Sequence, residues 1–226
     1  MFYVGGQVLK GKRKVTISTE RGEIPLILDT DRALWKGEVI NGKRVNTWID
    51  PAYKAWRNMF ERAYKMKDRR PSYDEVIVCG EWFTFSNFDN WYNNNFLEGC
   101  VLDKDILLPG NKVYCPEFCR FVPPHINTLL SVSKRSKRAG LLGTHTRKSD
   151  GKISARASGH RGKHLGYFNS EKEAHFAWLE DKAKSIELVA EDYKLSGNYL
   201  PEIHNALLDR AEILRGFIAS GIVYNP

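Results

Sequence analysis

The sequence predicts an α+β protein. Its first half contains a strand–turn–strand–helix segment, and its second half a three-stranded antiparallel sheet packed on one helix, followed by a C-terminal helix. Residues 152–158 alternate strictly between polar and apolar, which is typical of a strand with one buried face. Residues 53–64, 176–190 and 203–214 instead repeat apolar side chains every three or four positions, which is typical of helices with one buried face.

The N-terminal part of the chain predicts a hairpin and two helices. Residues 15–18 and 24–28 flank Gly22 and predict a hairpin. Asp50 as N-cap and Pro51 at the first helical position predict the start of a helix, and we expect a short strand at 76–78 and a helix at 84–92. The aromatic residues of this part are expected in the core rather than on a base-stacking surface: Trp48, Trp56, Trp82, Phe85, Phe88 and Trp91.

Residues 99–130 predict a strand at 99–107, a turn at 108–111, a second strand at 121–122 and a short helix. This is the order of elements in a ββα metal site. Hydrolysis of a phosphodiester requires a divalent cation to stabilise the leaving oxygen, and magnesium prefers oxygen ligands. Asp103 on the first strand and Asn127 on the helix could supply them, whereas the alternative role for Asp103 and Asp105 is to cap the turn beside Pro109.

Positive charge is concentrated in one segment of the chain. The whole chain carries a net charge of +8, and residues 131–164 contain ten Lys or Arg against one acid, Asp150. This pattern favours a polyphosphate partner, namely a nucleic acid, over a solvated loop. The candidate DNA-binding residues are Lys134, Arg135, Lys137, Arg138, Arg147, Lys148, Lys152, Ser154, Arg156, Arg161 and Lys163.

Other features of the composition indicate the cellular setting. No apolar run is long enough for a membrane span, and the first ten residues do not resemble a signal peptide, so a cytoplasmic protein is expected. The four cysteines show no regular framework, which fits a reducing compartment. Cys115 and Cys119 form the one close pair, and buried free thiols are favoured over a structural zinc site.

Residues 48–130 resemble the HNH-type endonucleases, including homing endonucleases, carried by bacteriophages. The resemblance rests on an aromatic pattern from Trp56 to Trp91 and on the motifs VCGEW (78–82), LDKD (102–105), GNKVY (110–114) and CRFVPPHIN (119–127). It implies a divalent-metal nuclease that uses Mg²⁺ or Mn²⁺, with Asp103 and Asn127 as metal ligands.

The sequence departs from the pattern of this family at two positions. Lys104 stands where the family has its general-base histidine, and lysine, with an ordinary pKa of about 10.4, is a poor base at neutral pH. The position of the middle asparagine falls on Phe118, or on Asn111 if the loop is shifted. Lys104, Asp105 and His125 are the candidates for helping water attack, and the alternative function is a DNA-binding protein that no longer cuts.

The C-terminal part is similar to the plant Apetala, or ethylene-response-factor, DNA-binding domain. The motifs are GLLG (140–143), the alternating run 152–158, HLGYF (164–168) and the helix beginning near Glu173, and they cover residues 140–192. The resemblance implies a double-stranded DNA partner, with the outer face of the sheet in the major groove. By the alternation, Lys152, Ser154 and Arg156 should lie on that face, although the family's tryptophan on the middle strand is missing.

These inferences divide the chain into five segments: a β-rich segment (1–47), the nuclease-like domain (48–130), a basic linker (131–139), the Apetala-like domain (140–195) and a helical tail (196–226). A monomer is favoured. A third reading is a structural or regulatory phage protein whose basic segment contacts RNA or protein.

Overall fold

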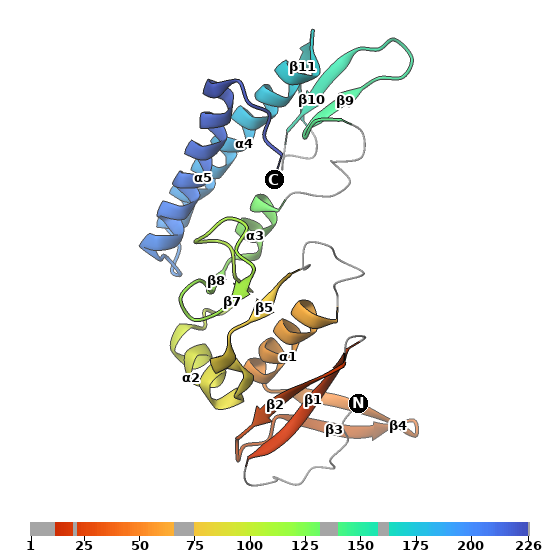
Figure 1. Ribbon diagram of the computed structural model, residues 1–226, viewed down its shortest axis with the longest axis vertical. Helices are drawn as coiled ribbons and strands as arrows, with labels where there is room; N and C mark the ends of the chain where they lie inside the picture. The colour runs from red at the N-terminus through yellow and green to blue at the C-terminus, as the bar shows by residue number, and fades with distance from the viewer. Residues whose placement is uncertain (1–11, 20–21, 66–74, 132–139, 158–162, 226) are drawn as a thin grey trace. The chain divides into compact units, whose positions relative to one another are not determined.

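A computed structural model of the chain describes residues 12–19, 22–65, 75–131, 140–157 and 163–225. The protein is a mixed α+β structure that divides into two compact units, Met1–Phe121 and Val122–Pro226. Figure 1 labels the elements of both units, and each unit is described by itself. This division is coarser than the five predicted segments, whose boundaries stay predictions, and most of the predicted linker lies outside the described residues.

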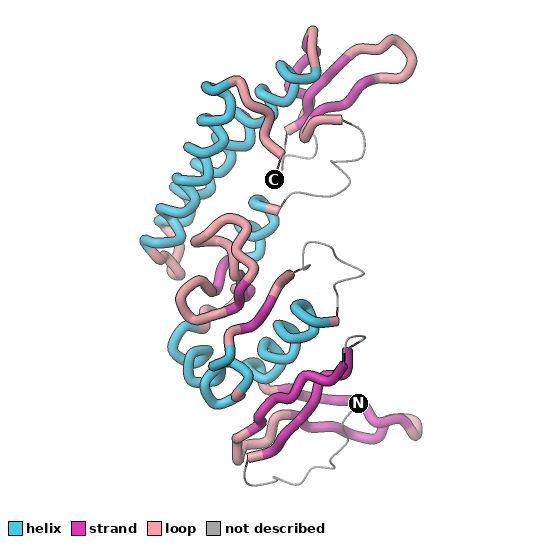
Figure 2. Tube along the Cα trace, in the orientation of Figure 1, coloured by secondary structure: helices cyan, strands magenta, loops and turns pink. Residues whose placement is uncertain are grey.

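Two antiparallel hairpins open the first unit (Figure 2). The predicted one is confirmed: β1 (Arg13–Thr19) pairs with β2 (Gly22–Leu28). The other was not predicted: β3 (Trp35–Ile40) pairs with β4 (Lys43–Ile49) through a turn at Asn41 and Gly42, both with positive φ. That pair of residues is a strong local hairpin signal.

The predicted helices of the first unit are present as α1 (Pro51–Tyr64) and α2 (Phe85–Asn95), the latter preceded by a 3₁₀ turn, Gly80–Phe83. The carboxylate of Asp50 caps α1 by accepting a hydrogen bond from the backbone N–H of Tyr53 at 2.9 Å. The Arg32 guanidinium binds the same carboxylate and that of Asp89 in the middle of α2, so one cation joins the start of α1 to α2.

Aromatic side chains form most of the core between these helices. Trp56, Phe60, Trp82, Phe85 and Phe88 are buried and meet in edge-to-face or tilted contacts with centroid separations near 5 Å. The predicted core role is therefore confirmed for most of them. It is wrong for Trp48, which lies on β4 and is 41% exposed.

Two further pairs of short strands complete the first unit. β5 (Ile77–Val78) runs parallel to β7 (Val113–Tyr114), and β6 (Val101–Asp103) pairs with β8 (Arg120–Val122). The predicted strand at 99–107 is shorter than expected. It ends at Asp103 because that side chain turns the chain by binding the following backbone N–H groups.

The second unit contains the predicted three-stranded antiparallel sheet and two long helices. The strands β9 (Thr144–Thr146), β10 (Ile153–Arg156) and β11 (His164–Phe168) lie in the order β11-β10-β9. One face of this sheet packs on α4 (Glu171–Lys194), and α5 (Pro201–Ser220) lies along α4. The short helix α3 (Pro124–Leu130) begins the unit.

Local contacts explain how α4 begins and how it holds the loop before the sheet. Ser170 Oγ accepts a hydrogen bond from Glu173 N at 3.2 Å, and the Glu173 carboxylate accepts one from Asn169 N at 3.1 Å. Gly143 has a φ of +78°, and a Cβ there would lie 1.9 Å from the Trp178 ring of α4. Glycine is thus required where the loop meets the helix.

None of the helices in the described part of the chain combines the length and apolar character that crossing a membrane requires.

Candidate functional site

Asp103, the predicted metal ligand, lies at the end of β6 and caps the turn that follows. Its Oδ1 accepts hydrogen bonds from the backbone N–H groups of Asp105 (2.9 Å) and Ile106 (2.6 Å). Burial, and then the neighbouring Asp105 carboxylate, raise the pKa of Asp103 to about 6. The turn-capping role is therefore present, and two carboxylates lie close together at this point.

Lys104, at the predicted position of the base, is buried and takes part in a reciprocal clamp across the loop 104–111. Its Nζ donates to the backbone carbonyl of Asn111 at 2.8 Å, and Asn111 Nδ2 donates to the backbone carbonyl of Lys104 at 2.6 Å. Asn111 also binds Val113 through both of its amide atoms. Lys104 Nζ lies 3.4 Å from Asp105 Oδ2. The lysine therefore closes the loop and partly neutralises the acidic pair.

The pair of acids can be tested against the implied metal. Magnesium is often held by one or two carboxylates together with water and substrate phosphates. Asp103 keeps one carboxylate oxygen that accepts no backbone hydrogen bond, and Asp105 is partly exposed, so the two fit a hard divalent cation with few protein ligands. Within the ranges that the structure describes, no three or more His, Cys, Asp or Glu side chains gather in a group that could hold a metal ion.

The other predicted members of this site lie on α3, in the second unit. His125 is exposed on the first turn of that helix, and Asn127 is partly buried, with its backbone carbonyl accepting a hydrogen bond from Ser131 Oγ. Asp103 and Asn127 thus belong to different compact units, and their pairing at one metal stays a prediction.

The cysteines of the first unit are free thiols. Cys115 and Cys119 are buried and lie at the two ends of one turn, because Cys119 N donates a hydrogen bond to Cys115 O at 3.0 Å. Burial raises the pKa of both thiols, and that of Cys79, so these groups are held as neutral thiols rather than as thiolates.

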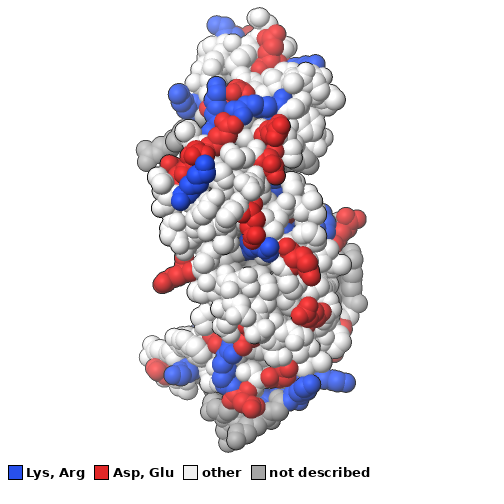
Figure 3. All heavy atoms as spheres, turned by 90° about the vertical axis from the view of Figure 1, so that its left-hand side faces the viewer, with Lys and Arg blue, Asp and Glu red and all other residues white. Residues whose placement is uncertain are grey.

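The outer face of the β9–β11 sheet carries exposed cations. The candidates that the structure describes there or at the strand ends are exposed, with the exception of Ser154: Arg147, Lys148, Lys152, Arg156 and Lys163. On α4 and α5, three cations pair with acids: Lys184 with Glu180, Lys194 with Glu191, and Arg215 with Glu187 and Glu180. Figure 3 shows basic and acidic side chains interspersed on the face that carries α5. The unbalanced positive charge of this unit therefore lies on the side of the sheet.

Ser154 corrects the predicted set. It lies on the central strand opposite Tyr167 on β11 and His145 on β9, and the pairing with β11 shifts register between Ala155 and Arg156. Its side chain, however, is only 6% exposed, and its Oγ donates to the backbone carbonyl of His145 at 3.2 Å. A short side chain between two larger neighbours is shielded from solvent, and the expectation that Ser154 is accessible to DNA is wrong.

Tyr167 is a feature of this face that the sequence reasoning missed. Its ring is 57% exposed, and the cationic groups of Arg147 and Lys152 each lie 5.7 Å from its centroid. The His164 ring lies 4.7 Å away. An exposed aromatic flanked by two cations holds them by cation–π attraction. The signal was available, because Tyr167 lies in the predicted strand 164–168, which directly follows the basic segment.

Asp150 limits the charge that this face presents. Its carboxylate binds Arg147 in a two-point contact and accepts a hydrogen bond from Lys152 N.

Five predicted DNA-binding residues lie outside the described residues: Lys134, Arg135, Lys137, Arg138 and Arg161.

Comparison with protein-family models, with curated proteins and with solved structures found no match to this chain.

Proposed function

We propose that this chain binds duplex DNA through the outer face of the β9–β11 sheet. The observation that carries the proposal is the set of exposed cations on and beside that face, in a segment with ten basic residues and one acid. Lysine and arginine bind phosphates, and arginine also binds base edges. Arg156, the last residue of the central strand, is then the candidate base-reading residue, and Lys152, directly before that strand, is a candidate phosphate contact.

The binding proposal is tested by fluorescence anisotropy with labelled duplex DNA over a range of salt concentrations. Each phosphate contact contributes about 0.9 to the slope of log affinity against log salt, so Lys152→Ala with Arg156→Ala should lower the slope by up to about 2 and weaken binding. The matched control replaces two cations of α4, Lys184→Ala with Lys194→Ala, which removes the same charge away from the sheet. Equal losses in both double variants would overturn the assignment to the sheet.

A second candidate function is favoured by the carboxylate pair in the first unit. We propose that Asp103 and Asp105 hold a divalent cation and that the chain is a metal-dependent DNA endonuclease of the HNH homing type. Burial, and then the neighbouring Asp105 carboxylate, raise the pKa of Asp103, and a bound cation would offset both effects by stabilising the charged carboxylates. Magnesium or manganese bound there would stabilise the leaving oxygen of a phosphodiester.

The chain's own residues restrict how such an enzyme would work. The Lys104 ammonium is committed to the Asn111 carbonyl, so it serves to position the acidic loop rather than to accept a proton. Asp105 is the more exposed of the two acids and is the better placed to meet water or substrate. His125, exposed on α3, stays a candidate base.

A plasmid-nicking assay with Mg²⁺ or Mn²⁺ tests the endonuclease proposal. Wild type should nick supercoiled DNA, and Asp103→Asn and Asp105→Asn should not, while both variants still bind duplex. A second readout is the melting temperature, which manganese should raise in wild type and leave unchanged in Asp105→Asn. No nicking of any duplex and no shift with metal, with DNA binding intact, would leave a DNA-binding protein that does not cut.

A further inference from the structure

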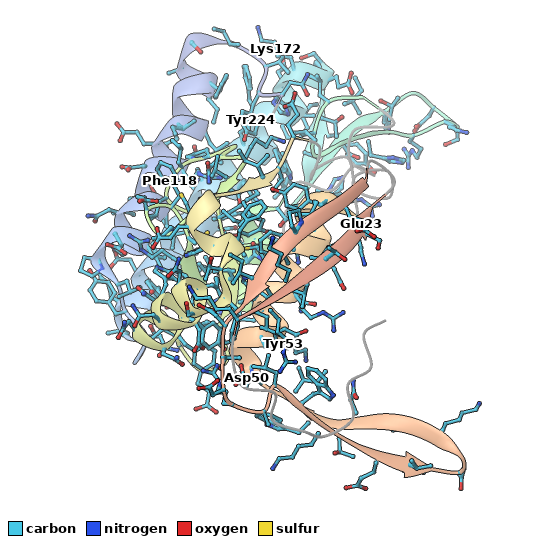
Figure 4. The ribbon with its side chains drawn as sticks, turned by 60° about the horizontal axis from the view of Figure 1, so that its bottom comes forward. Glu23, Asp50, Tyr53, Phe118, Lys172 and Tyr224 are labelled. Carbon is cyan, nitrogen blue, oxygen red and sulfur yellow. The ribbon has the colours of Figure 1, made fainter. Side chains whose placement is uncertain are left out.

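The β3–β4 hairpin of the first unit is exposed on both faces. Five of the six residues of β3 are exposed, and the hairpin extends away from Asp50 and the helices of its unit (Figure 4). The turn at Asn41 and Gly42 has φ values of 51° and 74°, the left-handed pair that matches the twist of a two-residue hairpin. The element is therefore a regular two-stranded ribbon with a tight tip.

Large apolar side chains stand on this ribbon in contact with water. Val39 is 67% exposed and Ile40 is 48% exposed, and both lie directly before the turn. Val45 and Trp48 on β4 are 43% and 41% exposed. Val39 and Ile40 are consecutive residues of a strand, so one apolar side chain stands on each face of the tip. An isolated hairpin is marginal in water, and large exposed apolar side chains gathered at one end of it favour an interaction site. The apolar tip of the hairpin is therefore a candidate interaction site.

The charge of the ribbon indicates which partner. Residues 35–49 contain three basic residues, Lys36, Lys43 and Arg44, against one acid, Glu38. Lys36 and Lys43 are exposed, and Lys36 Nζ lies 5.8 Å from the centre of the Trp48 ring. Cations flanking an apolar tip complement a polyanion that also offers an apolar interior. Duplex DNA has that character, since its phosphates lie outside a stack of bases.

We propose that the β3–β4 hairpin is a second DNA contact, which tracks a groove and places Val39 and Ile40 against the base pairs. Apolar side chains at a hairpin tip that enters the minor groove unstack a base step and kink the duplex. Lys36 and Lys43 then meet the flanking phosphates. The inference rests on the proposed function in one respect, because both take duplex DNA as the ligand, but it assigns a separate surface in the other unit.

The test uses the full chain and two variants of the hairpin. Val39→Thr with Ile40→Thr keeps the β-branched shape that strands prefer and removes the apolar character. Lys36→Ala with Lys43→Ala removes two charges. The matched control is Ile77→Thr, the same change at an isoleucine of β5 that is also 48% exposed. Circular dichroism checks that each variant is folded.

Two measurements are made on a doubly labelled duplex: affinity by anisotropy and bending by energy transfer between the DNA ends. The threonine variant should bind about tenfold more weakly and lose the bend while keeping the wild-type salt dependence, because the wedge is uncharged. The alanine variant should lower the salt slope by about 2. Ile77→Thr should behave like wild type in both assays.

The outcomes separate this inference from the proposed function. A loss of affinity in the hairpin variants with no effect of Arg156→Ala supports the hairpin as a DNA contact and refutes the proposal that the β9–β11 sheet binds the duplex. The reverse result overturns the hairpin. Light scattering supplies a further arm: a wild-type dimer that becomes a monomer in the threonine variant would assign the apolar tip to a second copy of the chain and would also overturn the inference.

Discussion

Replacing Lys104 by methionine tests whether this residue is structural or catalytic. Methionine keeps most of the length and apolar stem of the side chain but removes the ammonium that donates to the Asn111 carbonyl. A hydrogen bond from a charged group contributes about 1.5–3 kcal/mol, and the buried carbonyl would be left without this donor. The substitution also removes the cation beside two carboxylates. We expect the first unit to lose about 2 kcal/mol of unfolding free energy.

The assay is urea unfolding followed by two signals. Five of the six tryptophans, Trp35, Trp48, Trp56, Trp82 and Trp91, lie in the first unit, so their fluorescence reports mainly on it, whereas helical circular dichroism is dominated by α4 and α5 of the second unit. The fluorescence midpoint should fall and the dichroism midpoint should change little. Lys54→Met, at an exposed position of α1, is the matched control and should stay within about 0.5 kcal/mol of wild type.

One result would refute the structural reading of Lys104. If Lys104→Met unfolds at the wild-type urea concentration in both signals, the clamp contributes nothing to stability. If nicking is then also lost, the ammonium acts in the chemistry.

Three further predictions concern other sites. Asp150→Asn should raise duplex affinity about threefold by releasing Arg147 for phosphate, measured by anisotropy, and weaker binding would contradict it. The folded pKa of Asp103, about 6, lies above its ordinary 3.8, so the folded chain binds the extra proton and stability should fall as pH rises through this window. Asp103→Asn should flatten that dependence in urea titrations from about pH 4 to 6.5, and an unchanged slope would exclude this carboxyl as its source. Gly143→Ala should cost the second unit about 3 kcal/mol, because the φ of +78° disfavours alanine and the added Cβ meets Trp178, and an unchanged thermal midpoint by circular dichroism would refute this.

Local signals account for the parts of the fold that could be read from the sequence. The start of α1 depends on Asp50 and Pro51, and the start of α4 on Ser170, so neighbouring residues alone determine both. The strand at β10 follows from alternation, and its pairing in a three-stranded sheet on α4 follows from the order of elements. The β3–β4 hairpin was missed although Asn41 and Gly42 carry a local turn signal.

The α+β class, the helix starts and the position of the basic segment could be read from the residues alone, because caps, periodicity and charge act between near neighbours. The folded structure was needed to establish what the acidic loop does. Lys104 and Asn111 are seven residues apart, and only the folded loop brings the ammonium onto a carbonyl and away from the role of a base. It also decided that Ser154 is shielded and that Trp48 is exposed, since burial depends on which strand lies opposite and on what covers a hairpin.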